Sequence, residues 1–147
     1  MAINIELAER VLDAIARHPE RHNQYTWRSP SETLPPRCKT TMCIGGWAGF
    51  LEGGVWVSDD PENDFFGEFL PTPADHPNIV HEYDGLRWVP PEDRAQRVLN
   101  LTNDQANPLF YNCDNEEALA YLRELIAEAK SVEAMTANPM PVEEPAF

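Results

Sequence analysis

The sequence predicts a mainly α fold: a small compact bundle of about four to five helices, with scope for a two-stranded β ribbon and with an acidic excursion. Three observations predict it. The chain has the length of one domain at 147 residues, 42% of its residues are hydrophobic, and several segments carry apolar residues at helical spacing. We expect a single α-rich domain over 1–130 with an acidic insertion at about 58–85. Residues 131–147, which include prolines and glutamates but no basic residue, are expected to form a C-terminal tail.

The first helix is expected over 5–18. Asn4 is a residue type preferred at the N-cap, and Pro19 ends the helix because the residue before a proline is disfavoured in the α conformation. Apolar residues recur at intervals of three and four, so they share one face. That face consists of Ala8, Val11, Leu12 and Ile15.

A second helix is expected to begin near Thr41. Each glycine inside a helix costs about 1 kcal/mol relative to alanine, so the glycines of this segment need a physical reason. A spacing of four places Gly45, Gly49 and Gly53 on one side, where a segment of this chain or of another chain can approach closely. The apolar face consists of Ile44, Trp47, Ala48 and Leu51.

Two short β-prone runs, 55–57 and 86–89, flank the acidic insertion and are expected to pair as a ribbon. Within the insertion, Pro61 favours the start of a short helix, since proline suits the first helical position. About thirty residues without strong periodicity therefore separate the two strands that are expected to pair.

Three further segments complete the predicted bundle. A third helix is expected over 92–100, with its inward face at Ala95, Val98 and Leu99. Thr102 and Gln105 have capping-box spacing and begin a fourth helix, which Pro108 limits and restarts. Asp114 and Glu117 cap the last helix in the same way. Its apolar stripe consists of Ala118, Leu119, Leu122, Leu125, Ile126 and Ala129.

The charge of the chain is strongly negative and unevenly distributed. Eleven basic residues against twenty-five acidic ones give a net charge of −14. This balance disfavours direct binding to nucleic acid or to an anionic membrane, because both require positive charge. Between Lys39 and Arg87 there is no lysine or arginine. We therefore expect a protein partner with a basic surface.

Other features predict the compartment. No apolar run reaches the roughly 18–20 residues needed to cross a bilayer, and the first residues lack the basic and apolar regions of a secretory signal. Three cysteines are too few, and odd in number, for a disulfide scaffold. We expect a cytoplasmic protein with free thiols.

Two segments resemble a known family. Residues 38–48 read C-K-T-T-M-C-I-G-G-W-A and are similar to the C-x-T-x-x-C-I-A-G-W-A signature of small proteins of actinobacteria and their phages. Residues 99–110 are similar to that family's L-G-L-T-x-x-Q-A-x-x-L-F block, and the departures are Gly45, Asn100 and Pro108. The resemblance extends over 5–54 and 92–112. It implies a phage or actinobacterial accessory protein, acting in the host cytoplasm if phage-encoded, and it supplies no catalytic residues.

The acidic insertion holds the candidate binding face. Aromatic residues among acids can form an apolar centre with an acidic rim, which suits a phage protein that acts on a host nucleic-acid-binding protein or that mimics DNA phosphates. The alternative is that the aromatics, Tyr83 among them, fill the core and the acids are simply solvated. The face consists of Trp56, Asp59, Asp60, Glu62, Asp64, Phe65, Phe66 and Phe69.

The cysteines support a different hypothesis. Cys43 lies in the first turn of the predicted second helix, where the helix dipole favours a thiolate, so with a histidine base it suits a cysteine-dependent hydrolase or transferase. Cys38, Cys43 and Cys113 with one histidine can instead form a zinc site, and a disulfide between Cys38 and Cys43 is a further alternative. The simplest interpretation is a set of buried free thiols without a cofactor. The candidate histidines are His18, His22, His76 and His81.

Overall fold

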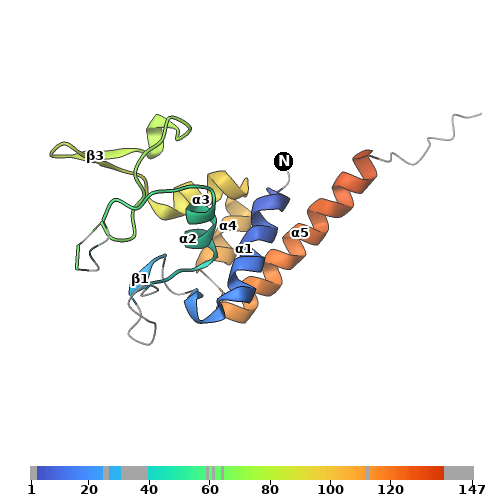
Figure 1. Ribbon diagram of the computed structural model, residues 1–147. Coiled ribbons are helices and arrows are strands. Elements are labelled where there is room, and N and C mark those ends of the chain that lie inside the picture. Colours follow the sequence, from blue (N-terminus) through green and yellow to red (C-terminus); the bar gives the residue numbers. More distant parts are fainter. Residues whose placement is uncertain are drawn as a thin grey trace, which may run out of the picture.

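The computed structural model describes residues 3–24, 27–30, 40–58, 60, 62–63, 65–111 and 113–137. It confirms the mainly α fold. Within these residues the chain forms five α-helices and two small antiparallel ribbons, and Figure 1 shows the helices gathered into one bundle. No helix of the described part has both the length and the apolar surface required to span a bilayer.

The first helix, α1 (Ile5–Arg17), agrees with the sequence prediction. The side-chain oxygen of Asn4 accepts a hydrogen bond from the N–H of Leu7 at 3.1 Å, which caps the first turn. The backbone N–H of Asn4 donates to the carbonyl of Leu99 at 2.7 Å, so the same residue joins the start of α1 to the end of the third helix. A short 3-10 turn, η1 (Pro19–Arg21), follows. The buried face consists of Leu7, Ala8, Val11 and Ile15.

The second helix, α2 (Ile44–Leu51), begins later than predicted. The chain before it is extended, because β2 (Thr40–Thr41) pairs antiparallel with β1 (Ser29–Pro30). Cys43 is the N-cap, and its sulfur accepts the N–H of Gly46 at 3.4 Å. The strand pairing therefore fixes where α2 can start.

The glycines of α2 make room for rings of the same chain. A Cβ on Gly49 would lie 2.6 Å from the ring of Phe69, and a Cβ on Gly45 would overlap the ring of Trp27. Gly53 has open space around its Cα and a φ of +100°, so it serves the turn after the helix and not the close contact. The predicted groove is thus filled from within.

Two shorter helices follow. The third helix, α3 (Pro91–Leu99), ends at Asn100 in the left-handed conformation. The capping box at the start of α4 (Asn103–Tyr111) is confirmed: the hydroxyl of Thr102 accepts the N–H of Gln105, and the side-chain oxygen of Gln105 accepts the N–H of Thr102. The predicted interruption at Pro108 is wrong, since α4 continues through it. A proline removes one helical hydrogen bond, and burial of Leu109 next to it offsets that loss.

The last helix, α5 (Asn115–Ala137), begins at the predicted cap, where Asp114 and Glu117 exchange hydrogen bonds. It is longer than predicted. The tail was expected from residue 131, but α5 continues to Ala137, and 138–147 lie outside the described residues. The buried stripe ends at Ala129, and Figure 1 shows the last turns of α5 extending beyond α1. The stripe consists of Ala118, Leu122, Leu125, Ile126 and Ala129.

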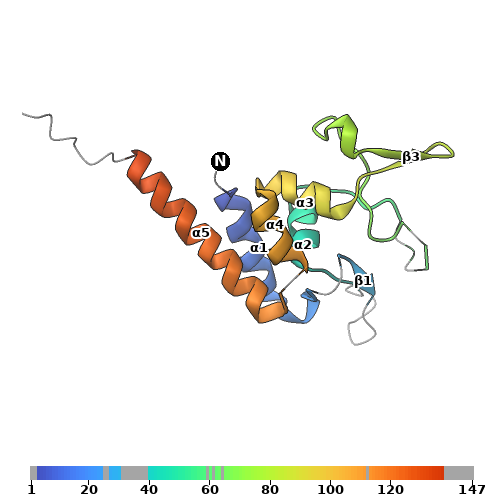
Figure 2. The same ribbon diagram turned by 180° about the vertical axis from the view of Figure 1, so that it is seen from behind.

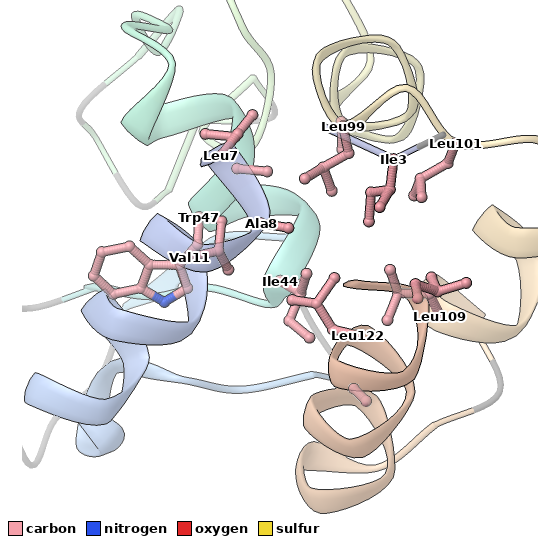
Figure 3. Packing of buried hydrophobic residues seen from close by; sticks show 14 of the residues in the cluster. Ile3, Leu7, Ala8, Val11, Ile44, Trp47, Leu99, Leu101, Leu109 and Leu122 are labelled. Carbon is pink, nitrogen blue, oxygen red and sulfur yellow. The ribbon is translucent and has the colours of Figure 1, made fainter. Parts of the chain in front are cut away.

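The core lies where the helices meet. Helix α2 packs against α1 and α3, and α5 packs against α1 and α4. Figure 3 shows side chains from all of these helices converging on one cluster. The labelled members are Ile3, Leu7, Ala8, Val11, Ile44, Trp47, Leu99, Leu101, Leu109 and Leu122.

A hairpin projects from the bundle. It consists of β3 (His81–Tyr83) and β4 (Leu86–Trp88), preceded by a 3-10 turn, η3 (Pro77–Ile79). Asp84 and Gly85 have φ angles of 51° and 80°, which is the two-residue turn that matches the twist of a hairpin. Figures 1 and 2 show this hairpin on the side of the bundle away from α5.

The predicted partners of the ribbon are wrong. Phe69 exchanges backbone hydrogen bonds with Val89, and the carbonyl of Glu68 accepts the N–H of Val57 at 2.8 Å. The segment around Phe69 therefore lies between the two runs that were expected to pair. Pro61, the expected start of a short helix, lies outside the described residues, and Glu62 and Asn63 form turns.

Candidate functional site

The acidic lobe, defined here as residues 55–89, is the candidate functional site. Phe69 fastens it to the bundle. This side chain is fully buried, its ring stacks on the ring of Trp56 with centroids 4.1 Å apart, and it covers Gly49 and Gly54. One ring thus joins the lobe to the glycine face of α2.

A second attachment is a cation from outside the lobe. The guanidinium of Arg28 lies 3.9 Å from the ring centroid of Phe66 and 4.6 Å from that of Trp56. It also donates hydrogen bonds to the carbonyls of Ser58 and Phe66, at 2.8 and 2.9 Å. Cation–π contacts gain strength when they are shielded from water. Arg28 therefore binds the aromatic side chains on the inner side of the lobe and fixes the lobe to the rest of the protein.

The third attachment is a buried ion pair. The carboxylate of Asp75 accepts hydrogen bonds from Arg94 at 2.6 and 3.0 Å and from Arg97 at 2.9 Å, and both side chains of the Asp75–Arg94 pair are fully buried. The N–H of Thr72 adds a further bond at 2.7 Å. Burial alone would raise the pKa of Asp75, but the hydrogen bonds from Arg94 and Thr72 outweigh it and hold the pKa below its usual value. Arg94 also donates to the carbonyl of Leu70.

These attachments divide the residues of the predicted binding face into an inner group and an exposed group. Phe66 and Phe69 are buried and Trp56 and Phe65 are half-buried, so these aromatics form an inner layer of the lobe, as the alternative interpretation held. The described acids of the predicted face, Asp60 and Glu62, are exposed. Asp59 and Asp64 lie outside the described residues.

Sequence reasoning missed two features, the buried Asp75–Arg94 ion pair and the hairpin of β3 and β4. Asp75 and Arg94 have no local pattern that marks them as partners, since they are 19 residues apart. Tyr83, which the sequence shows only as one of several aromatic residues of the acidic insertion, is 75% exposed beside the turn of the hairpin. The Asp84-Gly85 dipeptide between two β-prone runs was a usable signal for that hairpin.

Glu68 is a half-buried acid without the compensation that Asp75 has. Its Oε2 is buried and has no hydrogen-bond partner among the described residues. Burial, with smaller contributions from the charges of Glu92 and Asp93, raises the pKa of Glu68 to about 7. The folded protein therefore favours the protonated form of this carboxyl.

This shift predicts a pH-dependent stability. Between pH 4.5, the usual pKa, and about 7, the folded state binds more protons at Glu68 than the unfolded state does, so the free energy of unfolding falls as the pH rises through this range. Glu68→Gln removes the charge. We expect the free energy of unfolding of Glu68→Gln minus that of wild type to increase by about 1–2 kcal/mol from pH 5 to pH 8. This value is reduced for the partial solvent exposure of the carboxyl.

Urea unfolding at the two pH values measures this difference. Glu62→Gln, at an exposed position of the same lobe, is the matched control and should leave the pH profile as in wild type. A Glu68→Gln profile that runs parallel to that of wild type would contradict the expectation.

The cysteine hypothesis finds no support in the geometry. Cys43 is buried, and burial raises the pKa of its thiol to about 12, so a thiolate is disfavoured despite the helix N-terminus. Cys113 is a half-buried free thiol, and burial and the charges of Glu117 and Asp114 raise its pKa. Cys38 lies outside the described residues. Those that are described contain no group of three His, Cys, Asp or Glu side chains arranged to hold a metal ion.

The four histidines make their contacts elsewhere. His22 bonds to the side-chain oxygen of Gln24 at 3.0 Å, and burial lowers its pKa. His18 approaches Glu20, His76 accepts the N–H of Asn78, and His81 stacks on a tryptophan of the hairpin. In the described part of the chain, none of them is joined to Cys43 as a general base would be.

Comparisons of the chain with protein-family models, with curated protein sequences and with solved structures gave no match.

Proposed function

We propose that this protein is a small accessory protein that acts by binding another protein, one with a basic surface, through its acidic lobe. The observation that carries the proposal is the charge of the lobe. Residues 40–86 contain no lysine or arginine, and the acids Asp60, Glu62, Glu82 and Asp84 are exposed. Within the described residues none of these four carboxylates makes an ion pair.

The contrast with Asp75 supports this proposal. The lobe neutralises its buried carboxylate with two arginines from α3, while the exposed carboxylates of Asp60 and Glu62 make no ion pair within the described residues. A surface with one sign of charge attracts an oppositely charged partner over about a Debye length, which speeds association and makes it sensitive to salt. The lobe therefore has the electrostatics of a recognition surface for a cationic protein.

The sequence resemblance adds a biological setting to the proposal. Proteins with the motif of residues 38–48 come from actinobacteria and their phages, so the proposed partner is a host or phage protein, and the proposed compartment is the bacterial cytoplasm. A partner that itself binds nucleic acid would present the required basic surface.

A charge-reversal experiment tests the proposal. The lobe variant carries Asp60→Lys, Glu62→Lys and Glu82→Lys, and a tagged form is used to capture partners from actinobacterial lysate at low and moderate salt, with identification by mass spectrometry. We expect wild type to retain one near-stoichiometric basic protein and the lobe variant to bind it at least about tenfold more weakly.

The matched control changes the same number of charges on the exposed side of α5: Glu116→Lys, Glu124→Lys and Glu128→Lys. This variant should bind as wild type does. Equal binding by the lobe variant and wild type would exclude the acidic lobe as the interface, and the absence of any partner at either salt concentration would count against a binding function altogether.

A further inference from the structure

The hairpin of the acidic lobe has two different faces. Side chains alternate between the faces of a strand, and directly opposed residues of paired strands share a face. The register pairs His81 with Trp88 and Tyr83 with Leu86, so one face carries these four side chains. The other face carries Glu82 opposite Arg87.

The aromatic face is covered at its base and open at its tip. The ring of His81 stacks on Trp88 with centroids 5.6 Å apart, and the ring of Phe65 packs on Trp88 at 4.9 Å. Toward the turn, Leu86 is half-buried and Tyr83 is 75% exposed, the largest exposed fraction among the large hydrophobic side chains of the described residues. The base therefore fixes the hairpin to the lobe, and the tip presents an uncovered tyrosine.

We propose that the tip of this hairpin is the contact element of the lobe, that Tyr83 is its anchor, and that it takes an arginine- and lysine-containing segment of a protein partner. The inference rests on the proposed function and specifies its interface. Tyrosine is enriched among residues that dominate binding energy, and its two side-chain torsions cost little entropy to fix.

The charges beside the tyrosine select the partner. Asp84 follows Tyr83 in the turn and is exposed, so a cationic side chain that contacts the ring also meets a carboxylate at the tip, while Glu82 lies on the opposite face across from Arg87. The turn at Asp84 and Gly85 has the conformation that matches the hairpin twist, which keeps these groups in a fixed arrangement before binding. A partner segment with alternating cationic and small residues fits this combination.

A defined peptide tests the interface without a known partner. The probe is a blocked 12-residue peptide of alternating arginine and serine, titrated into the full-length ¹⁵N-labelled protein at about 50 mM and 150 mM salt. We expect the largest amide shift changes at residues 81–88. Tyr83→Ala should weaken binding by about tenfold, while Tyr83→Phe should stay within about twofold of wild type, since the ring carries the contact.

Tyr111→Ala is the matched control, because Tyr111 is also exposed, at 60%, but lies on α4. It should not change the affinity. Tyrosine and alanine are both neutral near pH 7, so a loss at Tyr83 cannot come from a change in net charge. Thermal unfolding and unchanged amide shifts outside 81–88 confirm that the Tyr83→Ala variant is folded.

The outcomes separate this inference from the proposed function. Shift changes centred on Asp60 and Glu62, with Tyr83→Ala binding as wild type does, would overturn the hairpin as contact element and leave the acidic lobe as the binding surface. Shift changes spread over the acids of α5, or no binding at all, would overturn both.

Discussion

Replacing Asp75 by asparagine should lower the free energy of unfolding by about 3–5 kcal/mol. Asparagine keeps the shape of the side chain but removes its charge, which leaves the fully buried guanidinium of Arg94 and the partly buried one of Arg97 without their counter-ion. One nitrogen of each arginine, Nη1 of Arg94 and Nε of Arg97, already lacks a hydrogen-bond partner among the described residues. Among the described residues, no other hydrogen-bond acceptor can therefore replace the lost carboxylate.

Urea unfolding at pH 7 measures this cost, and a surface pair provides the control. Asp13 pairs with Arg17 at 3.1 Å on α1, but both side chains are more than half exposed. Asp13→Asn should cost less than about 0.5 kcal/mol, because exposed pairs are screened by solvent. A cost for Asp75→Asn no larger than that for Asp13→Asn would show that the buried pair does not stabilise the fold.

Phe69→Ala should also cost about 3–5 kcal/mol, by a different mechanism. The substitution opens a cavity against Gly49 and Gly54, whose missing side chains leave nothing to fill it, and it removes the ring stacked on Trp56. The guanidinium of Arg94, 5.1 Å from the same ring, becomes accessible to water. We expect lower stability together with a change in the tryptophan fluorescence.

The control for this substitution is Phe50→Ala on α2. Phe50 is 41% exposed, so its truncation should cost about 1 kcal/mol or less. If the two variants unfolded at the same urea concentration, Phe69 would not be the attachment that its contacts indicate. Hydrogen exchange adds a second measurement, since the amides of the lobe should lose protection in Phe69→Ala before those of α1 do.

The sequence predicted those parts of the fold whose causes are local. The helices α1, α3 and α5 follow from apolar periodicity, and their starts follow from neighbouring residues: Asn4 caps α1, and Asp114 with Glu117 caps α5. Each of these signals lies within one or two helical turns, so one sequence is enough to find it.

The errors concern contacts between distant segments. The ribbon received the wrong partner because the segment of Phe69, which separates 55–57 from 86–89, has no alternating pattern of its own. Asp75 belongs to an acidic stretch that predicts solvent exposure, and only the fold brings Arg94 to it. The glycines of α2 indicated a close approach without indicating which ring makes it.

The candidate site was likewise predictable only in part. Composition pointed to residues 55–89 as the candidate segment, since the absence of lysine and arginine from 40 to 86 is visible in the sequence. It did not distinguish inner from outer aromatics, because both kinds lie among acidic residues. Burial assigned Phe66 and Phe69 to the interior and left Tyr83 outside.

The attachment of the lobe has a consequence for how such a protein diversifies. Phe69 and Asp75 hold the lobe to the bundle through buried side chains, while Tyr83 and the exposed acids take no part in that attachment. Surface loops accept substitutions and changes of length at little cost to stability. The outer residues of the lobe can therefore change in sequence and length while the helices, and the two residues that fasten the lobe to them, stay the same.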